Sequence, residues 1–167
     1  DGRHWLSTWT HRLYQHLPGE PWRELHATRS EPGSLVSARV GAMLRTRSGE
    51  RWFGSDRGIS ILRESNGALS LMPAPIRPFE VSVIRNAGKD TLLVGTLGGG
   101  VCILPLRGGM GTTLNLPRPG EEERIHELSN RIYDFWPMGN GTYAVASACG
   151  LAEIGTHPGY IRPLRSI

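Results

Sequence analysis

The chain has 167 residues and a formal net charge of +4, and its 22 glycines and 12 prolines interrupt the sequence too often for a bundle of long helices. No run reaches the roughly 18 consecutive apolar residues of a membrane span, and the first residues lack the order of a secretion signal. The arginines are scattered singly and Lys89 is the only lysine, so a nucleic-acid-binding surface is not expected. The composition predicts many short segments joined by turns.

Short apolar segments recur along the chain with a fixed internal spacing. A partial copy at 5–8 precedes three fuller copies, in which an alternating run and a second motif start 12 residues apart: 40–44 and 52–59, 81–84 and 93–101, and 132–136 and 144–151. Turn residues typical of hairpins separate the members of each pair, at 48–49, 88–90 and 139–141. A third run follows at 59–62, 101–104 and 151–154, and a fourth at 68–71, 112–116 and 160–164. One unit of four short strands is therefore repeated.

Four antiparallel strands per repeat are typical of a β-propeller blade. We predict an all-β fold, a β-propeller of about four blades with four antiparallel strands each, lettered A to D outward from the central channel. The predicted blades are 1–36, 37–77, 78–128 and 129–167. Because the spacing of 12 puts the first A strand before residue 1, the first blade is expected to lack its innermost strand, and the chain to be an arc of a larger propeller.

Small residues occupy equivalent places in the four repeats. Ser7, Gly54, Gly95 and Ala146 fall at one position of strand B, which predicts that neighbouring blades press together there. Gly58, Gly100 and Gly150 begin the three later C strands, where a tight turn is expected to require a positive φ. Extra residues at 117–124 lengthen the third repeat. They are expected to form either a solvated charged loop or a recognition loop.

The segments 49–59 and 93–101, together with the Leu-Ser-Asn-Arg-Ile sequence at 128–132, resemble the two-component regulator propeller repeat. The resemblance covers the whole chain as one partial and three fuller repeats. It departs from that family's pattern at Thr46, Ala87 and Met138, where an aspartate is usual, and at Ala144, where a tryptophan is usual.

This resemblance implies the sensor region of a bacterial transmembrane signalling protein, located in the periplasm. It implies a small polar or oligosaccharide ligand, and as partners the adjacent blades and a β-sandwich domain of the parent protein; the sensor could also form a homodimer. A histidine kinase or diguanylate cyclase activity would belong to the parent protein, so this chain is not expected to be an enzyme.

The candidate ligand-binding residues lie in the D-to-A connections and B-to-C turns, which surround the mouth of a propeller channel. They are Arg39, Glu80 and Arg131 before three A strands, and Trp9, His11, Asp56 and Arg57 in the turns. An aromatic ring beside charged groups suits a sugar, because the ring supplies contact area and the charges fix hydroxyls. Alternatively, the arginines are solvated or ion-paired and Trp9 packs on an adjacent turn.

No catalytic, metal or cofactor site is predicted. The six histidines lack metal-ligand spacing, and the glycine runs at 98–100 and 108–111 lack the Lys-Ser/Thr pair of a phosphate loop. Cys102 and Cys149 are expected to be buried free thiols, with a disulfide left open. The alternative functions are a stand-alone or enzymatic propeller such as a streptogramin-lyase-like protein, in which His11 and Glu80 would be the histidine and acid, or a protein-interaction scaffold.

Overall fold

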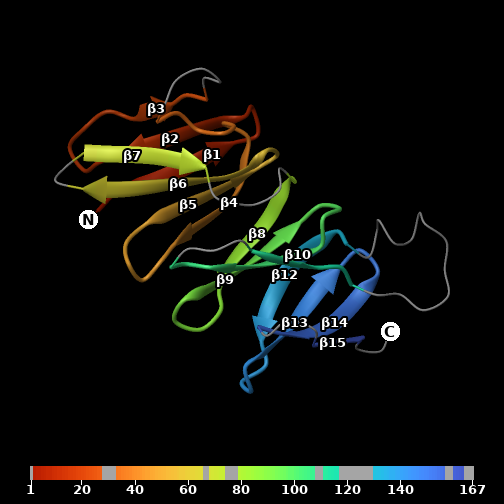
Figure 1. The fold of residues 1–167 in the computed structure, drawn as a ribbon. Helices are drawn as coiled ribbons and strands as arrows, with labels where there is room; N and C mark the ends of the chain where they lie inside the picture. The colour runs from red at the N-terminus through yellow and green to blue at the C-terminus, as the bar shows by residue number, and fades with distance from the viewer. Residues whose placement is uncertain are drawn as a thin grey trace.

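The computed structural model describes residues 2–27, 33–65, 68–73, 79–107, 111–116, 130–156 and 160–163. The regular structure in these residues is all β, in four antiparallel sheets, and none of it is a helix of the length and apolarity that crossing a membrane requires. Figure 1 shows the sheets following one another in chain order, from red at the first to blue at the last. The predicted all-β propeller architecture is confirmed.

Each sheet is a meander whose strands pair in sequence order. The first contains β1 (His4–Thr8), β2 (Arg12–His16) and β3 (Arg23–Leu25). The second contains β4 (Val40–Arg45), β5 (Arg51–Ser55), β6 (Gly58–Ser65) and β7 (Ala68–Pro73). The third contains β8 (Val81–Asn86), β9 (Thr91–Thr96), β10 (Val101–Pro105) and β11 (Thr112–Leu114), and the fourth β12 (Ile132–Pro137), β13 (Thr142–Ser147), β14 (Gly150–Gly155) and β15 (Ile161–Pro163). The blade limits after residues 77 and 128, like the loop at 117–124, lie outside the described residues, so the blade lengths stay a prediction.

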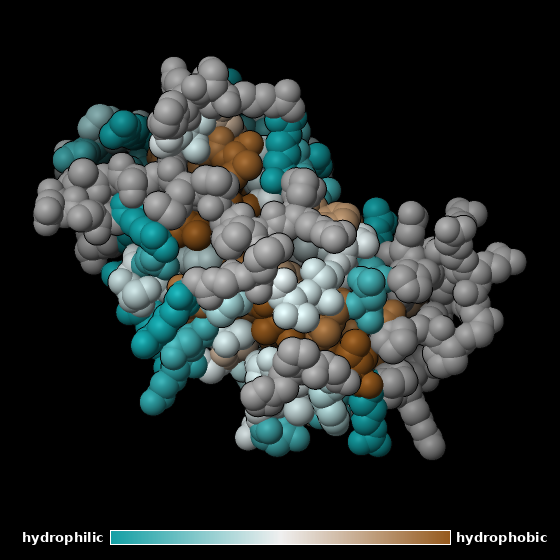
Figure 2. All heavy atoms as spheres, viewed as in Figure 1, coloured by the Kyte–Doolittle hydropathy of each residue, from teal (hydrophilic) through white to brown (hydrophobic). Residues whose placement is uncertain are grey.

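The hydrophobic core consists of three clusters, one at each seam between successive sheets. Phe53 of β5 packs toward the first sheet with Leu13, whereas its neighbour Trp52 packs toward the third sheet with Val94. Strand β5 is apolar on both faces because each face meets another sheet. In Figure 2, hydrophobic side chains show between the hydrophilic ones that occupy the edges of the molecule.

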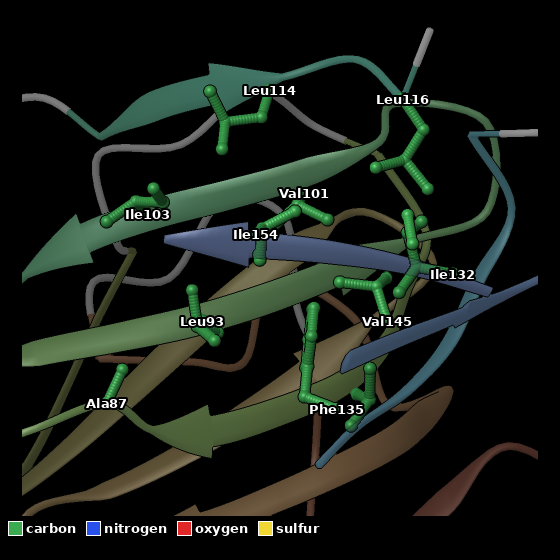
Figure 3. Close-up of a cluster of buried hydrophobic side chains, with 12 residues drawn as sticks. Ala87, Leu93, Val101, Ile103, Leu114, Leu116, Ile132, Phe135, Val145 and Ile154 are labelled. Atoms are coloured by element: carbon green, nitrogen blue, oxygen red, sulfur yellow. The ribbon is translucent and has the colours of Figure 1, made fainter. Parts of the chain in front are cut away.

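The third seam joins the third and fourth sheets. Leu93, Val101 and Ile103 from the third sheet point toward Val145 and Ile154 from the fourth (Figure 3). Leu93, Val101, Val145 and Ile154 are fully buried or nearly so. Burying such a side chain stabilises a fold by about 1.5–3 kcal/mol, so these clusters are the main stabilising contact between the sheets.

A β-bulge recurs near the start of each innermost strand. The register of β4 with β5 shifts between Val40 and Ala42, that of β8 with β9 between Val81 and Val83, and that of β12 with β13 between Ile132 and Asp134. Two residues that are two positions apart in a strand would normally point to the same face of the sheet. The extra residue of a bulge makes them point to opposite faces. Val81 therefore packs against the second sheet and Val83 against the fourth.

The small residues of strand B allow this packing. A Cβ built on Gly95 would lie 2.5 Å from Val83 Cγ1 and 2.7 Å from Ile132 Cγ2, and one on Gly54 would lie 2.5 Å from Val81 Cγ1. In the first sheet, Ser7 Oγ donates to the Val40 carbonyl at 2.7 Å. The predicted positive φ values are also present, at 110° for Gly58, 74° for Gly100 and 116° for Gly150.

Replacing Gly95 with alanine should destabilise the fold by about 1–3 kcal/mol, because the new methyl group overlaps two buried side chains from different sheets. Chemical denaturation monitored by tryptophan fluorescence measures the change. Gly41→Ala is the matched control, since a Cβ there meets only the Val81 carbonyl oxygen at 3.5 Å and its φ is not positive. Equal stability of the two variants would contradict the close approach at Gly95.

Replacing Gly41 with serine should stabilise the fold by about 0.5–1.5 kcal/mol through one added hydrogen bond. The bulge residue of the next sheet, Ser82, donates from Oγ to the Ile132 carbonyl at 2.5 Å. Gly41 faces the corresponding carbonyl of Val81, so a serine hydroxyl there can make the same bond. The midpoint of thermal unfolding should rise above that of Gly41→Ala; no rise beyond the alanine variant would show that the two bulges are not equivalent.

Candidate functional site

A pocket of about 360 Å³ lies where three sheets bring their B-to-C turns and D-to-A connections together. It is called the mouth pocket below, and its lining residues are Ser7, Thr8, Trp9, His11, Arg39, Val40, Gly41, Ser55, Asp56, Glu80 and Val81. Val40 and Val81 are buried and begin β4 and β8, so the seam packing also positions this part of the lining. Most of the other lining residues are polar or charged.

Five of the seven predicted ligand-binding residues line the mouth pocket: Trp9, His11, Arg39, Asp56 and Glu80. They come from three different repeats and are brought together by the succession of sheets. Arg57 lies in the same turn as Asp56 but is exposed and outside the lining. The role of these residues in ligand binding stays a prediction.

Arg131 is exposed and also outside the lining, and its backbone is paired with the third B-to-C turn. The amides of Gly98 and Gly100 both donate to the Asn130 carbonyl at 3.1 Å, and Leu97 forms a β-bridge with Arg131. Asn130 Oδ1 accepts from the Leu116 amide at 2.9 Å. The backbone bonds fix the third B-to-C turn to the connection before β12, and the Asn130 side chain ties that connection to the segment after β11.

The charged groups of the mouth pocket are available to a ligand. Asp56 Oδ1 is buried and has no hydrogen-bond partner, although a buried carboxylate oxygen without one is costly. In the part of the chain that the structure describes, the ion pairs of Arg12, Arg63, Arg85 and Arg107 do not include Arg39, Asp56 or Glu80. The pocket therefore offers two carboxylates and one guanidinium.

The rim of the pocket exposes an aromatic ring. Trp9 is 94% exposed, so the alternative in which it packs on an adjacent turn is wrong. His11 follows in the same turn with a φ of 63°, the only positive value among the described residues other than glycine. Histidine tolerates this conformation better than most residues, but it remains strained, and such strain gathers at functional sites.

The sequence reasoning missed a hydroxyl that ends each B strand. Ser55 Oγ donates to the Gly58 carbonyl at 2.9 Å and accepts from the Arg57 amide at 3.2 Å, which fixes the turn that carries Asp56. Thr96 donates likewise to Gly100 at 2.9 Å, and Ser147 to Gly150 at 3.1 Å. A serine or threonine at this place in all four repeats, Thr8 included, was the available signal.

The two cysteines differ in their surroundings. Both are free thiols, and burial raises the pKa of Cys102, which keeps that thiol protonated at neutral pH. Cys149 is only partly buried, so the expectation that both are buried is wrong for it. It lies in the turn between β13 and β14, at the end of the last sheet.

No family model matches the chain, and no curated protein matches it in sequence. Solved structures do match. The extracellular domain of the hybrid two-component system BT3049 from B. thetaiotaomicron has a TM-score of 0.71 and 18% identity over 96% of this chain and 22% of that one. The extracellular domain of the one-component system BT4673 from the same organism has a TM-score of 0.67 and 20% identity over 98% of this chain and 21% of that one.

Virginiamycin B lyase from Staphylococcus aureus, solved with quinupristin, is also similar, with a TM-score of 0.65 and 12% identity over 96% of this chain and 51% of the lyase. The chain thus spans about a fifth of the length of the two extracellular domains and about half of the lyase. At these identities the likeness establishes the fold, which sensor domains and lyases share.

Replacing His11 with glycine should raise the stability of the fold by about 0.5–1 kcal/mol, because glycine adopts the positive φ without strain. Thr10→Gly is the control, since Thr10 lies in the same turn without a positive φ and should lose stability. Urea denaturation of the two variants and the parent chain measures the difference. A loss of stability in both would show that the His11 side chain holds the turn together.

Proposed function

We propose that this chain is the ligand-sensing propeller segment of a bacterial transmembrane signalling protein, related to the two-component regulator propellers and located in the periplasm. The ligand is a small polar molecule or an oligosaccharide that binds in the mouth pocket. The fold shared with extracellular domains of signalling proteins supports the sensor role. A β-sandwich domain of the parent protein and a second copy of the sensor are the proposed protein partners.

The buried Asp56 Oδ1 without a partner carries this proposal. A sugar hydroxyl that donates to it would supply the hydrogen bond that the protein leaves unmade, and a hydrogen bond to a charged group is worth about 1.5–3 kcal/mol. Glu80 and Arg39 add an acceptor and a set of donors, and Trp9 offers a flat apolar face for a sugar ring.

Thermal unfolding of the chain in the presence of a panel of neutral and charged oligosaccharides tests the proposal. At least one member should raise the unfolding temperature, and Asp56→Ala and Trp9→Ala should each weaken its binding at least tenfold. Arg57→Ala is the matched control, because Arg57 lies in the same turn outside the pocket and its loss should leave binding unchanged. A panel without any stabilising member would contradict the sugar ligand, and equal effects of the Asp56 and Arg57 variants would contradict the site.

A lyase of the streptogramin type is the second candidate, since His11 and Glu80 line the same pocket and the lyase fold is similar. Incubation of the chain with quinupristin, followed by mass spectrometry, separates the two functions. A product that disappears in His11→Ala would favour the lyase, and unaltered quinupristin would favour the sensor.

A further inference from the structure

The mouth pocket separates its side-chain oxygens from its side-chain nitrogens. Its buried or half-buried polar side chains are those of Ser7, Thr8, Ser55, Asp56 and Glu80, and its exposed ones are those of Trp9, His11 and Arg39. The first set carries only hydroxyl and carboxylate groups, whereas every side-chain nitrogen of the lining belongs to the second. The interior of the pocket therefore presents oxygens to a ligand, and its rim presents nitrogens.

The two serine hydroxyls of the interior have their protons bound within the protein. Ser7 Oγ donates to the Val40 carbonyl at 2.7 Å. Ser55 Oγ donates to the Gly58 carbonyl at 2.9 Å and accepts from the Arg57 amide at 3.2 Å. Because a hydroxyl has one proton and two lone pairs, Ser7 can only accept a further hydrogen bond. A ligand must therefore bring the donors to this part of the pocket.

Two carboxylates make the interior of the pocket anionic. Asp56 Oδ1 is buried without a hydrogen-bond partner, and Glu80 supplies the second carboxylate. The guanidinium of the lining, Arg39, is exposed, so water screens its charge. A carboxylate oxygen that is shielded from water is stabilised most by a cation that also donates a hydrogen bond to it. The unmade hydrogen bond of Asp56 therefore favours a ligand with a positively charged donor.

An alkylammonium group has the properties that this interior requires. It carries one positive charge on a compact nitrogen, and its three N–H groups donate in different directions. Asp56, Glu80 and Ser7 offer it three acceptors. At the rim, the exposed ring of Trp9 attracts a cation and offers a flat apolar face to the carbon skeleton that bears the nitrogen.

We propose that the ligand of the mouth pocket carries a primary ammonium group, on an amino sugar or on a simpler amine. This inference rests on the proposed sensing role of the pocket and narrows the class of its ligands. The ammonium group donates to Asp56, Glu80 and Ser7, and the skeleton that bears it packs on Trp9. The hydroxyl oxygens of a sugar accept from Arg39 at the rim. The two carboxylates repel saccharides with uronic acid or sulfate groups, so the pocket selects its ligand by charge.

Calorimetric titration of the chain with a glucosamine tetrasaccharide and with its fully N-acetylated counterpart tests the proposal, at constant ionic strength in a mildly acidic buffer that keeps the amines protonated. The glucosamine form should bind at least tenfold more tightly. Asp56→Asn and Glu80→Gln, which keep the size of each side chain but remove its charge, should abolish this preference. Glu20→Gln is the matched control, because Glu20 is an exposed carboxylate outside the pocket and its loss should leave the preference unchanged.

Equal or tighter binding of the N-acetylated form would overturn the inference and leave a sensor of neutral sugars in place. A preference for the glucosamine form that persists in both Asp56→Asn and Glu80→Gln would also overturn it, because the carboxylates would then not bind the amine. If neither saccharide binds, the sugar ligand of the proposed function fails, and titration with butylamine decides the inference alone. Saturable binding of butylamine that Asp56→Asn abolishes assigns a simpler amine, whereas no binding overturns the inference.

Discussion

Neighbouring sheets approach each other closely at one residue of each B strand, and the arrangement of the sheets depends on this contact. Where Gly54 and Gly95 lack a side chain, the first residue of the next innermost strand fills the space, as Val81 and Ile132 do. The same Val81 lines the mouth pocket. The contact between Gly54 and Val81 therefore affects both the spacing of two sheets and the shape of the mouth pocket. A larger residue at position 54 would disturb both.

The bulges make this contact compatible with a sheet that is buried on both faces. An unbroken strand would direct Val81 and Val83 to the same side, and one of the two seams would lose a side chain. With the extra residue, a single short strand supplies both neighbours. Val40 and Val81 can then each meet the previous sheet and also line the mouth pocket.

Much of the fold could be predicted because its signals are local. Spacing within each repeat placed the starts of β4, β8 and β12 at Val40, Val81 and Ile132. The bulges could not be predicted in this way, since they depend on how one strand pairs with another. That Arg131 lies outside the lining of the mouth pocket, with its backbone paired to Leu97, could not be predicted because such pairing is visible only in three dimensions.

The walls of the mouth pocket belong to three sheets that are held together mainly by side-chain packing. A ligand that contacts Trp9, Asp56 and Glu80 at once would act as a cross-link between the first and third sheets. Among the described residues the first sheet has three strands whereas the others have four, so it should open most easily by local unfolding. A ligand in the mouth pocket should then slow amide hydrogen exchange along β2 and β3, beyond the residues that line the pocket, because it would suppress the opening of the first sheet.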